Sequence, residues 1–178
     1  MIQDIVPGCE EKLLESSCNG YIGFDPTADS LHIGSLVQIL ILMHFQNCGH
    51  KPIVLIGGAT GMIGDPSGKS AERNLLSKED LDNNIKGIQA QLSKFLKFDS
   101  NKNNSALICN NNDWFKSINL IDFIRDAGKH LTVNYMTAKD SVKKRLSSDS
   151  KEGMSFTEFT YQLIQAYDFY HLFTEKNC

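Results

Sequence analysis

Apolar runs separated by turn signals mark the first elements of the chain. The run GYIGFD (residues 20–25) predicts a strand that ends in a turn, and residues 33–47 predict a helix that Gly49 terminates. The continuous apolar run KPIVLIGG (51–58), bounded by Pro52 and by two glycines, is typical of a strand buried on both faces. Strand, helix and strand in this order predict a parallel βαβ unit, and therefore an α/β fold.

The alternation of helices and strands continues in the rest of the chain. A glycine-rich loop is expected at residues 57–70, and a helix from about Lys78 to Phe95, because apolar side chains recur there at helical spacing. These side chains are Leu81, Ile85, Ile88, Leu92 and Phe95. The remaining predicted elements are a strand at 105–110 and helices at 114–126 and 141–146.

Length and composition favour one compact domain. The chain has 178 residues, of which 41% are hydrophobic and 22% charged, and a chain of this size buries roughly 70% of its unfolded surface. The longest nearly apolar run, residues 33–45, is shorter than the ~20 residues that span a membrane, so it is expected to form a buried helix. The first residues lack the basic and apolar regions of a signal peptide, which predicts a cytoplasmic protein without a membrane partner.

Charge and cysteine usage narrow the function classes. A net charge of −3 argues against a surface whose main role is to hold nucleic acid by its phosphates. A basic group remains open as a local patch or a solvated helix face; it consists of Lys139, Lys143, Lys144 and Arg145. The five cysteines are scattered and lack zinc-ligand spacing, which predicts reduced thiols and no protein-bound metal.

The glycine-rich stretch resembles two phosphate-binding motifs but matches neither. A P-loop would need glycine at position 63, which is Ile63, and a dinucleotide fingerprint would need glycine at Ala59 or Thr60. The stretch nevertheless follows the carboxyl end of a buried strand, where parallel sheets bind ligands. Three charged side chains of this stretch face either solvent or a ligand: Asp65, Lys69 and Arg73.

The strand-to-helix junction at residues 32–35 suits a phosphate group. The first turn of a helix presents unpaired N–H groups and a partial positive charge, and Gly34 permits close approach of a nucleotide. His32 and Thr27 add side-chain donors. The alternative is that His32 is an ordinary surface histidine near a helix start.

The last predicted helix carries a polar stripe. Ser155 and Glu158 match a capping box, so the helix is expected to begin there. Tyr161, Gln165 and Asp168 then occur at i, i+4 and i+7 and share one face of an otherwise apolar helix. If buried, these groups require partners, because an unpaired buried polar group costs about 1 to 3 kcal/mol. A small polar ligand is one partner; the alternative is a stripe that faces water.

Five blocks in register carry a family resemblance. YIGFDPTADSLHIGS, GGATGMIGDPSGK, NNNDW, GKHLTVNYM and SFTEFTYQLIQAYDF occur in this order from about Tyr21 onward and together resemble bacterial-type tyrosyl-tRNA synthetases, a class I family. The resemblance implies a Rossmann-like parallel sheet, with residues 1–178 forming the N-terminal part of the catalytic, nucleotide-binding domain. A HIGH-like loop alone would also fit other nucleotidyltransferases.

By this resemblance the chain contains sites for L-tyrosine and ATP. Tyr21 and Asp168 would bind the phenolic hydroxyl of the substrate. Phenylalanine lacks this hydroxyl, so its binding would leave a buried donor and acceptor without a partner. The ammonium group of the substrate would be bound by Tyr161, Gln165 and Asp65, and Asn111 would support the site. The ATP site would comprise Gly23, Asp25, Thr27, His32, Gly34 and Ser35, of which Thr27, His32 and Ser35 would act catalytically.

The resemblance also implies the reaction and its partners. The tyrosine carboxylate would attack the α-phosphate of ATP, which Mg²⁺ accompanies, and the tyrosyl group would then pass to tRNA(Tyr). Lys69 and Arg73 match positions associated with tRNA or with the approach to the active site. The family is homodimeric, with residues 123–136 near the interface.

Departures from the family pattern concern Ser35 and the extent of the chain. The signature tetrapeptide commonly ends in histidine, and serine is shorter and never cationic, so weaker adenylate formation is expected. The later catalytic blocks and the tRNA-binding domains are absent, which predicts a truncated domain with an open sheet edge, an incomplete core and poor ligase activity. The alternative function is a non-catalytic tyrosine- or nucleotide-binding module.

Overall fold

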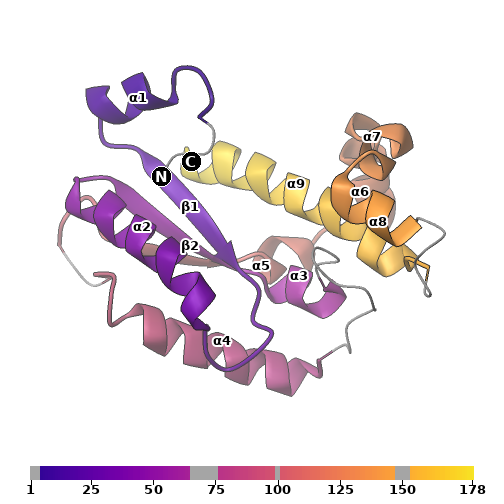
Figure 1. The fold of residues 1–178 in the computed structure, drawn as a ribbon, viewed down its shortest axis with the longest axis horizontal. Coiled ribbons are helices and arrows are strands. Elements are labelled where there is room, and N and C mark those ends of the chain that lie inside the picture. The colour runs from indigo at the N-terminus through magenta and orange to yellow at the C-terminus, as the bar shows by residue number, and fades with distance from the viewer. Residues whose placement is uncertain (1–4, 65–75, 99–100, 147–152) are drawn as a thin grey trace.

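A parallel sheet forms the centre of the molecule (Figure 1). The computed structural model describes residues 5–64, 76–98, 101–146 and 153–178. Its strands lie in the order β1 (Asn19–Phe24), β2 (Lys51–Ile56) and β3 (Leu107–Asn110), and both pairings are parallel. The predicted βαβ unit and the predicted third strand are therefore confirmed. Within the described residues β1 pairs with β2 only, which agrees with the expected open edge.

The junction after β1 begins with a tighter turn than predicted. A 3₁₀ turn, η1 (Ile33–Ser35), precedes α2 (Leu36–Asn47). The expectation that this apolar segment is a buried helix is wrong. Ile39 and Leu42 are buried, but Ile33 is 82% exposed, and Val37 and Ile41 are exposed as well. A helix that covers a sheet buries only the face turned toward it, so the opposite face of α2 stays outside the core.

The glycine-rich stretch is helical in its first half, which corrects the predicted loop. Residues Gly58–Ile63 form α3, and Gly64, with a φ of 88°, ends it. Because glycine tolerates positive φ, the chain can leave the helix sharply at this point. Residues 65–70 of the predicted loop lie outside the described residues.

The next helix, α4 (Lys78–Leu92), begins at Ser77, whose hydroxyl accepts from the backbone N–H of Asp80. Four of its predicted apolar side chains are buried: Leu81, Ile85, Ile88 and Leu92. The prediction for Phe95 is wrong, because the helix ends before this residue and its side chain is 36% exposed. Helical spacing no longer directs a side chain once the helix has ended.

Short helices lead to one long helix. The segment predicted as a single helix at 114–126 is divided into two. The capping box of the long helix is confirmed: the Ser155 hydroxyl accepts from the Glu158 N–H, and the Glu158 carboxylate accepts from the Ser155 N–H. The remaining helices are α1 (Cys9–Glu15), α5 (Asn112–Phe115), α6 (Leu120–Asp126), η2 (Gly128–His130), α7 (Val133–Thr137), α8 (Asp140–Leu146) and α9 (Phe156–Lys176).

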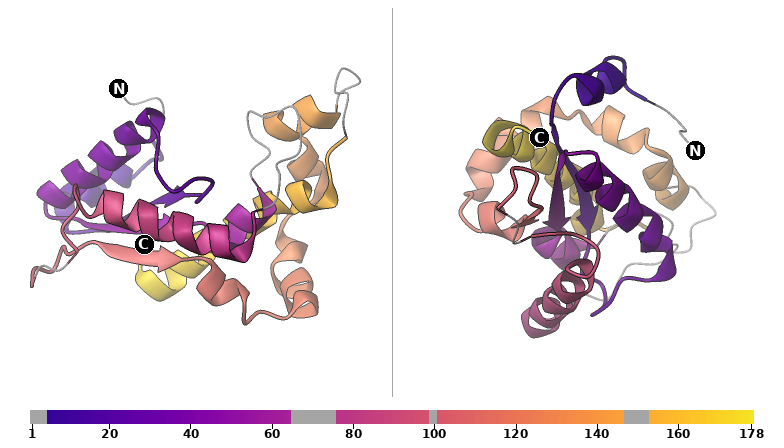
Figure 2. Two further views of the ribbon diagram at one scale, coloured as in Figure 1. Left: turned by 90° about the horizontal axis from the view of Figure 1, so that it is seen from below. Right: turned by 90° about the vertical axis from the view of Figure 1, so that its left-hand side faces the viewer.

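Helices cover both faces of the sheet (Figure 2). Val54 and Ile56 of β2 belong to an apolar cluster with buried side chains of α2 and α4, whereas Ile53 and Leu55 pack with Trp114 and with residues of α9. Alternate residues of a strand point to opposite faces, so β2 supplies both clusters. None of the helices in the described part of the chain combines the length and apolar character needed to span a lipid bilayer.

Candidate active site

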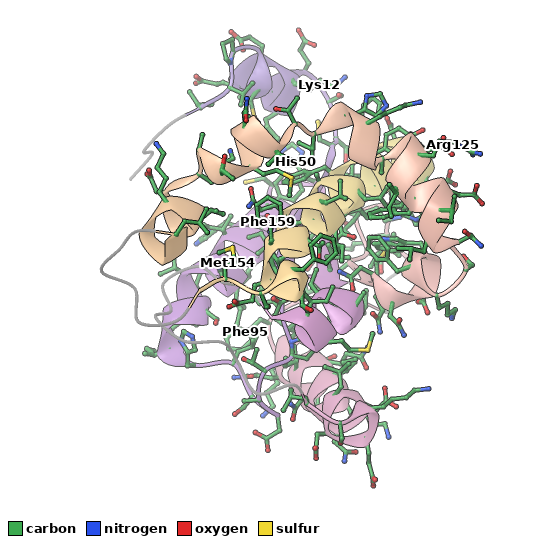
Figure 3. The ribbon with its side chains drawn as sticks, turned by 90° about the vertical axis from the view of Figure 1, so that its right-hand side faces the viewer. Lys12, His50, Phe95, Arg125, Met154 and Phe159 are labelled. Atoms are coloured by element: carbon green, nitrogen blue, oxygen red, sulfur yellow. The ribbon has the colours of Figure 1, made fainter. Side chains whose placement is uncertain are left out.

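A cavity of about 590 Å³ lies beside β1, η1 and α9. Met154 and Phe159, labelled in Figure 3, mark the N-terminal end of α9, the helix that closes one side of the cavity. The backbone of β1 and the turn after it form another side, and the end of β2 with the start of α3 forms the floor. The polar lining side chains are Tyr21, Asp25, Thr27, His32, Ser35, Gln38, Thr60, Tyr161, Gln165 and Asp168.

Tyr21 and Asp168 meet at this cavity although they come from opposite ends of the chain. Both line it, and Phe169 packs edge-on against the Tyr21 ring with centroids 5.5 Å apart. Burial raises the pKa of the Tyr21 phenol, and the nearby Asp168 carboxylate raises this pKa further. Tyr21 therefore stays protonated and can donate a hydrogen bond.

Asp168 is a buried acid with two protein donors. Only 2% of the residue is exposed, and Asn111 Nδ2 and Trp114 Nε1 donate to its two carboxylate oxygens at 3.1 and 3.0 Å. Burial raises the pKa of Asp168 to about 6, even though both hydrogen bonds act to lower it. The charge of Asp25 adds to the increase. Near pH 7 the carboxylate is mostly ionised and can accept from a ligand hydroxyl.

A second acid, the half-buried Asp25, is joined to Asp168 by a hydrogen-bond network. The hydroxyls of Tyr161 and Thr60 donate to its two oxygens at 2.8 and 2.6 Å. Asn111 links the acids, because its Nδ2 also lies 3.2 Å from the Thr60 hydroxyl and its Oδ1 accepts from the backbone N–H of Ala59 at 2.7 Å. The network fixes both carboxylates relative to one backbone segment.

Close packing around Asp25 also explains the first glycine after β2. A Cβ atom on Gly57 would collide with Asp25 Oδ1 and with the Thr60 hydroxyl, so a larger residue would displace the acid. The glycine is therefore required by the site itself, not by a phosphate-binding motif.

The polar stripe of α9 is divided between the protein interior and solvent. Tyr161 and Asp168 are buried, whereas Gln165 is exposed at the cavity wall. The alternative in which the whole stripe faces water is therefore wrong for two of its three members. Buried polar groups require partners, and here the partners are Asp25, Asn111 and Trp114.

The junction at residues 32–35 turns its polar groups toward the same cavity. His32 Nδ1 accepts from the Gly34 N–H at 2.9 Å, so the proton of the neutral ring lies on Nε2, which is available as a donor. A Cβ on Gly34 would come within 2.6 Å of His32 Cε1, which gives this glycine a local role. Ser35 is 8% exposed and lines the cavity, whereas Gly34 does not.

The structure brings together most of the predicted site residues. Those that line the cavity are Tyr21, Gly23, Asp25, Thr27, His32, Ser35, Tyr161, Gln165 and Asp168. Asn111 lies behind them as a buried support, and Gly34 lies outside the lining. Asp65, Lys69 and Arg73 lie outside the described residues. Their predicted roles stay predictions.

Thr60 and Trp114 had no predicted role, yet both belong to the network. The signal for Trp114 was its place in NNNDW, where an indole follows three asparagines and an aspartate at the end of a strand. The only signal noted at Thr60 was that a dinucleotide fingerprint would need glycine at this position.

The five cysteines are unpaired and all lie in described segments. No group of three or more His, Cys, Asp or Glu side chains is placed to hold a metal ion within residues 5–64, 76–98, 101–146 and 153–178.

The cavity lies beside the strands of a parallel sheet, with the η1 turn and the start of α2 on one side and the carboxylates of Asp25 and Asp168 on the other. This arrangement is typical of α/β folds that bind nucleotides. Comparison with known sequences identifies the family. The profile described as tRNA synthetases class I (W and Y) matches residues 15–178. The chain therefore belongs to this class I tRNA synthetase family.

Individual relatives agree with this assignment. The chain is 62% identical to a tyrosine–tRNA ligase of Flavobacterium johnsoniae and 61% identical to one of Bacteroides thetaiotaomicron, over 178 residues in each case. The alignment covers 100% of this chain but only 41% of each relative. The structure of a C-terminally truncated mitochondrial tyrosyl-tRNA synthetase from Coccidioides posadasii is similar with a TM-score of 0.81 and 33% identity, over 98% of this chain and 49% of that chain.

Proposed function

We propose that the chain forms the tyrosine- and ATP-binding part of a tyrosine–tRNA ligase. The observation that carries this proposal is the pairing of Tyr21 with the buried, doubly hydrogen-bonded Asp168 in one cavity. The names of the relatives support the same reaction, although the chain spans less than half of their length.

Recognition of the phenol follows from the chemistry of these two groups. Asp168 would accept the phenolic O–H of L-tyrosine, and Tyr21 would donate to the phenolic oxygen. A bound phenylalanine would leave both groups without a partner in a desolvated site, which is a larger penalty than the loss of one contact. Tyr161, Gln165 and Asp65 would hold the ammonium group, and Asp25 would keep the Tyr161 hydroxyl in place.

ATP would occupy the part of the cavity beside the junction at residues 32–35. Thr27 and the Nε2–H of His32 would donate to phosphate oxygens, and Gly23, Asp25 and Ser35 would border the nucleotide. Gly34 lies outside the lining, so its place in the ATP site rests on the family resemblance alone. Mg²⁺ would enter with ATP as part of the substrate.

The chemistry requires no general base. The tyrosine carboxylate is ionised at pH 7 and would attack the α-phosphorus directly, forming tyrosyl-adenylate while pyrophosphate leaves. The protein would contribute alignment of two anions and donors for the charge that grows on the phosphate oxygens. Transfer of the tyrosyl group to tRNA(Tyr) would follow, with Lys69 and Arg73 near the approach.

We also propose a homodimer in the cytoplasm. Apolar side chains are exposed on α6 and α7: Ile124, Val133 and Tyr135 lie within residues 123–136, the segment predicted near the family interface, and Leu120 and Ile121 lie just before it.

An alternative is a tyrosine- or nucleotide-binding module without ligase activity. Ser35 favours it, because a hydroxyl supplies a shorter reach and no positive charge where the family commonly has histidine. Residues 1–178 alone are expected to catalyse poorly under either proposal.

Two measurements test these proposals. Calorimetry with L-tyrosine and L-phenylalanine tests the pocket; equal affinities would refute it. Tyrosine-dependent exchange of pyrophosphate into ATP tests the chemistry. Turnover by residues 1–178 near that of a full-length relative would refute the expected poor activity, and tyrosine binding without any exchange would favour the binding module.

A further inference from the structure

An aromatic stack lies behind the acid of the cavity. His171 of α9 stacks on Trp114 with ring centroids 4.1 Å apart and an interplanar angle of 20°. Trp114 Nε1 in turn donates to Asp168 Oδ1 at 3.0 Å. Asp168 and His171 are three residues apart on one helix and therefore lie on the same side of it. One turn of α9 thus carries both the carboxylate that the indole binds and the ring that covers the indole.

We infer that His171 is a positioning residue for amino acid specificity: its ring holds the Trp114 indole in the plane that keeps Nε1 on the Asp168 carboxylate. This inference rests on the proposed function, because it concerns the tyrosine pocket. The position of an indole N–H depends on the orientation of the whole ring plane. A flat partner at stacking distance restricts that orientation.

His171 acts at a distance from the ligand. It does not line the cavity, so its effect must pass through Trp114 and then Asp168. Burial lowers the pKa of His171, which favours a neutral ring near pH 7 and stacking without charge. Within the described residues the other ring contact of Trp114 is with Phe115, whose centroid lies 6.4 Å away with a tilt of 47°, so Phe115 is not a parallel partner that could replace His171.

The two amino acids should respond differently to loss of the stack. If the indole turns away, Asp168 keeps only the Asn111 donor and its orientation toward the cavity loosens. Tyrosine depends on that orientation, whereas phenylalanine makes no hydrogen bond to the acid. His171→Ala should therefore lower the tyrosine affinity and leave the phenylalanine affinity nearly unchanged.

The chain offers a matched control and a specific probe. His50 stacks on Phe45 with centroids 4.6 Å apart at 24°, and neither residue lines the cavity. His50→Ala removes a comparable histidine stack away from Asp168. Trp114 is the single tryptophan of the sequence, so fluorescence excited near 295 nm reports on this indole alone.

The experiment compares wild type, His171→Ala, His171→Phe and His50→Ala as 178-residue chains. Calorimetry measures affinities for L-tyrosine and L-phenylalanine, and acrylamide quenching of Trp114 emission measures indole exposure. We expect His171→Ala to lower the ratio of tyrosine to phenylalanine affinity by about twofold to tenfold, the range for loss of one aromatic pair. Its indole should also become more accessible to acrylamide. His171→Phe, which keeps a flat ring, should restore both properties, and His50→Ala should change neither.

The outcomes separate this inference from the proposed function. An unchanged affinity ratio in His171→Ala would overturn the positioning role even if the wild type discriminates strongly. An equal loss of discrimination in His50→Ala would also overturn it, because the effect would then be general destabilisation. A wild-type chain that binds both amino acids equally would refute the proposed function and the specificity claim together.

Discussion

On the α2 and α4 side of the sheet, Val54 and Ile56 pack into an apolar cluster, whereas on the α9 side Ile53 and Leu55 pack next to a buried carboxylate network. Successive residues of β2 thus point into two different regions, an apolar cluster and a region beside buried polar groups. The apolar side gains stability from area removed from water. The α9 side also buries the carboxylate of Asp168 and, in part, that of Asp25, and the hydrogen bonds there offset only part of the cost of desolvation. Stability and chemistry are therefore concentrated on opposite faces.

The largest effect is expected from a substitution in the apolar cluster on the α2 and α4 side of the sheet. Leu92 of α4 is fully buried in that cluster. Leu92→Ala should lower the free energy of unfolding by about 2 to 5 kcal/mol, because the removed methyl groups leave a cavity. Urea denaturation measures this loss. The ratio of tyrosine to phenylalanine affinity should remain as in the wild type.

The exposed Lys94→Ala is the matched surface variant and should change stability by less than about 0.5 kcal/mol. A change in amino acid discrimination by Leu92→Ala, measured under conditions where it is folded, would show that the two faces are not separate.

The next largest effect is expected from a substitution in the carboxylate network on the α9 side. Asp168→Ala should weaken tyrosine binding by about 2 to 3 kcal/mol, or roughly 30- to 150-fold, because the charge-assisted hydrogen bond from the phenolic O–H to the carboxylate is lost. Phenylalanine binding should change little. Calorimetry with both amino acids measures the difference.

Glu175→Ala removes an exposed acid from the same helix and serves as the control. If Asp168→Ala weakened the binding of both amino acids equally, the acid would have a structural role only.

The apolar side is also the part that the sequence predicted best. The spacing of Leu81, Ile85, Ile88 and Leu92 predicts the buried face of α4 correctly, because helical periodicity places these four side chains on one side of the helix. The prediction failed at Phe95, where the helix ends earlier, and at α2, where an apolar segment has one exposed face. The spacing of apolar residues indicates which side of a helix can be buried, but it does not show how many sides of the helix are covered by the rest of the protein.

The candidate site was predictable only in part. Tyr161, Gln165 and Asp168 share a helix face that can be read from spacing, and the family resemblance added Tyr21 and Asn111. The bond from Trp114 to Asp168 and the contacts of Thr60 with Asp25 join segments far apart in sequence. No local pattern encodes such pairings, because they arise when the segments that follow β1, β2 and β3 pack together with α9.

A third prediction concerns the pH dependence of stability on the α9 side. The pKa of Asp168 in the folded chain is about 6, mainly because of burial, whereas an unfolded aspartate has a pKa near 3.9. Between these values the folded chain binds more protons than the unfolded chain. The contribution of Asp168 to stability is therefore present below about pH 4 and lost as the pH rises through about 6.

Asp168→Asn isolates this contribution. The free energy of unfolding of the wild type, relative to that of Asp168→Asn, should fall by about 2 kcal/mol between pH 4 and pH 7. Denaturation curves at several pH values measure the difference. Parallel pH profiles for the two chains would contradict the elevated pKa.

The smallest effect is expected from a substitution at the cavity wall that faces the predicted ATP site. Ser35 lies in the turn before α2 and lines the same cavity as Asp168 of α9, and its hydroxyl is the donor where the family resemblance leads one to expect histidine. Ser35→His should strengthen ATP binding by about 1 kcal/mol, because the imidazole N–H reaches further toward a phosphate or ribose oxygen. Calorimetric titration with ATP and Mg²⁺ measures the gain. Ser35→Phe adds a ring without a donor and should weaken binding, so an equal gain in both variants would attribute the effect to packing instead of hydrogen bonding.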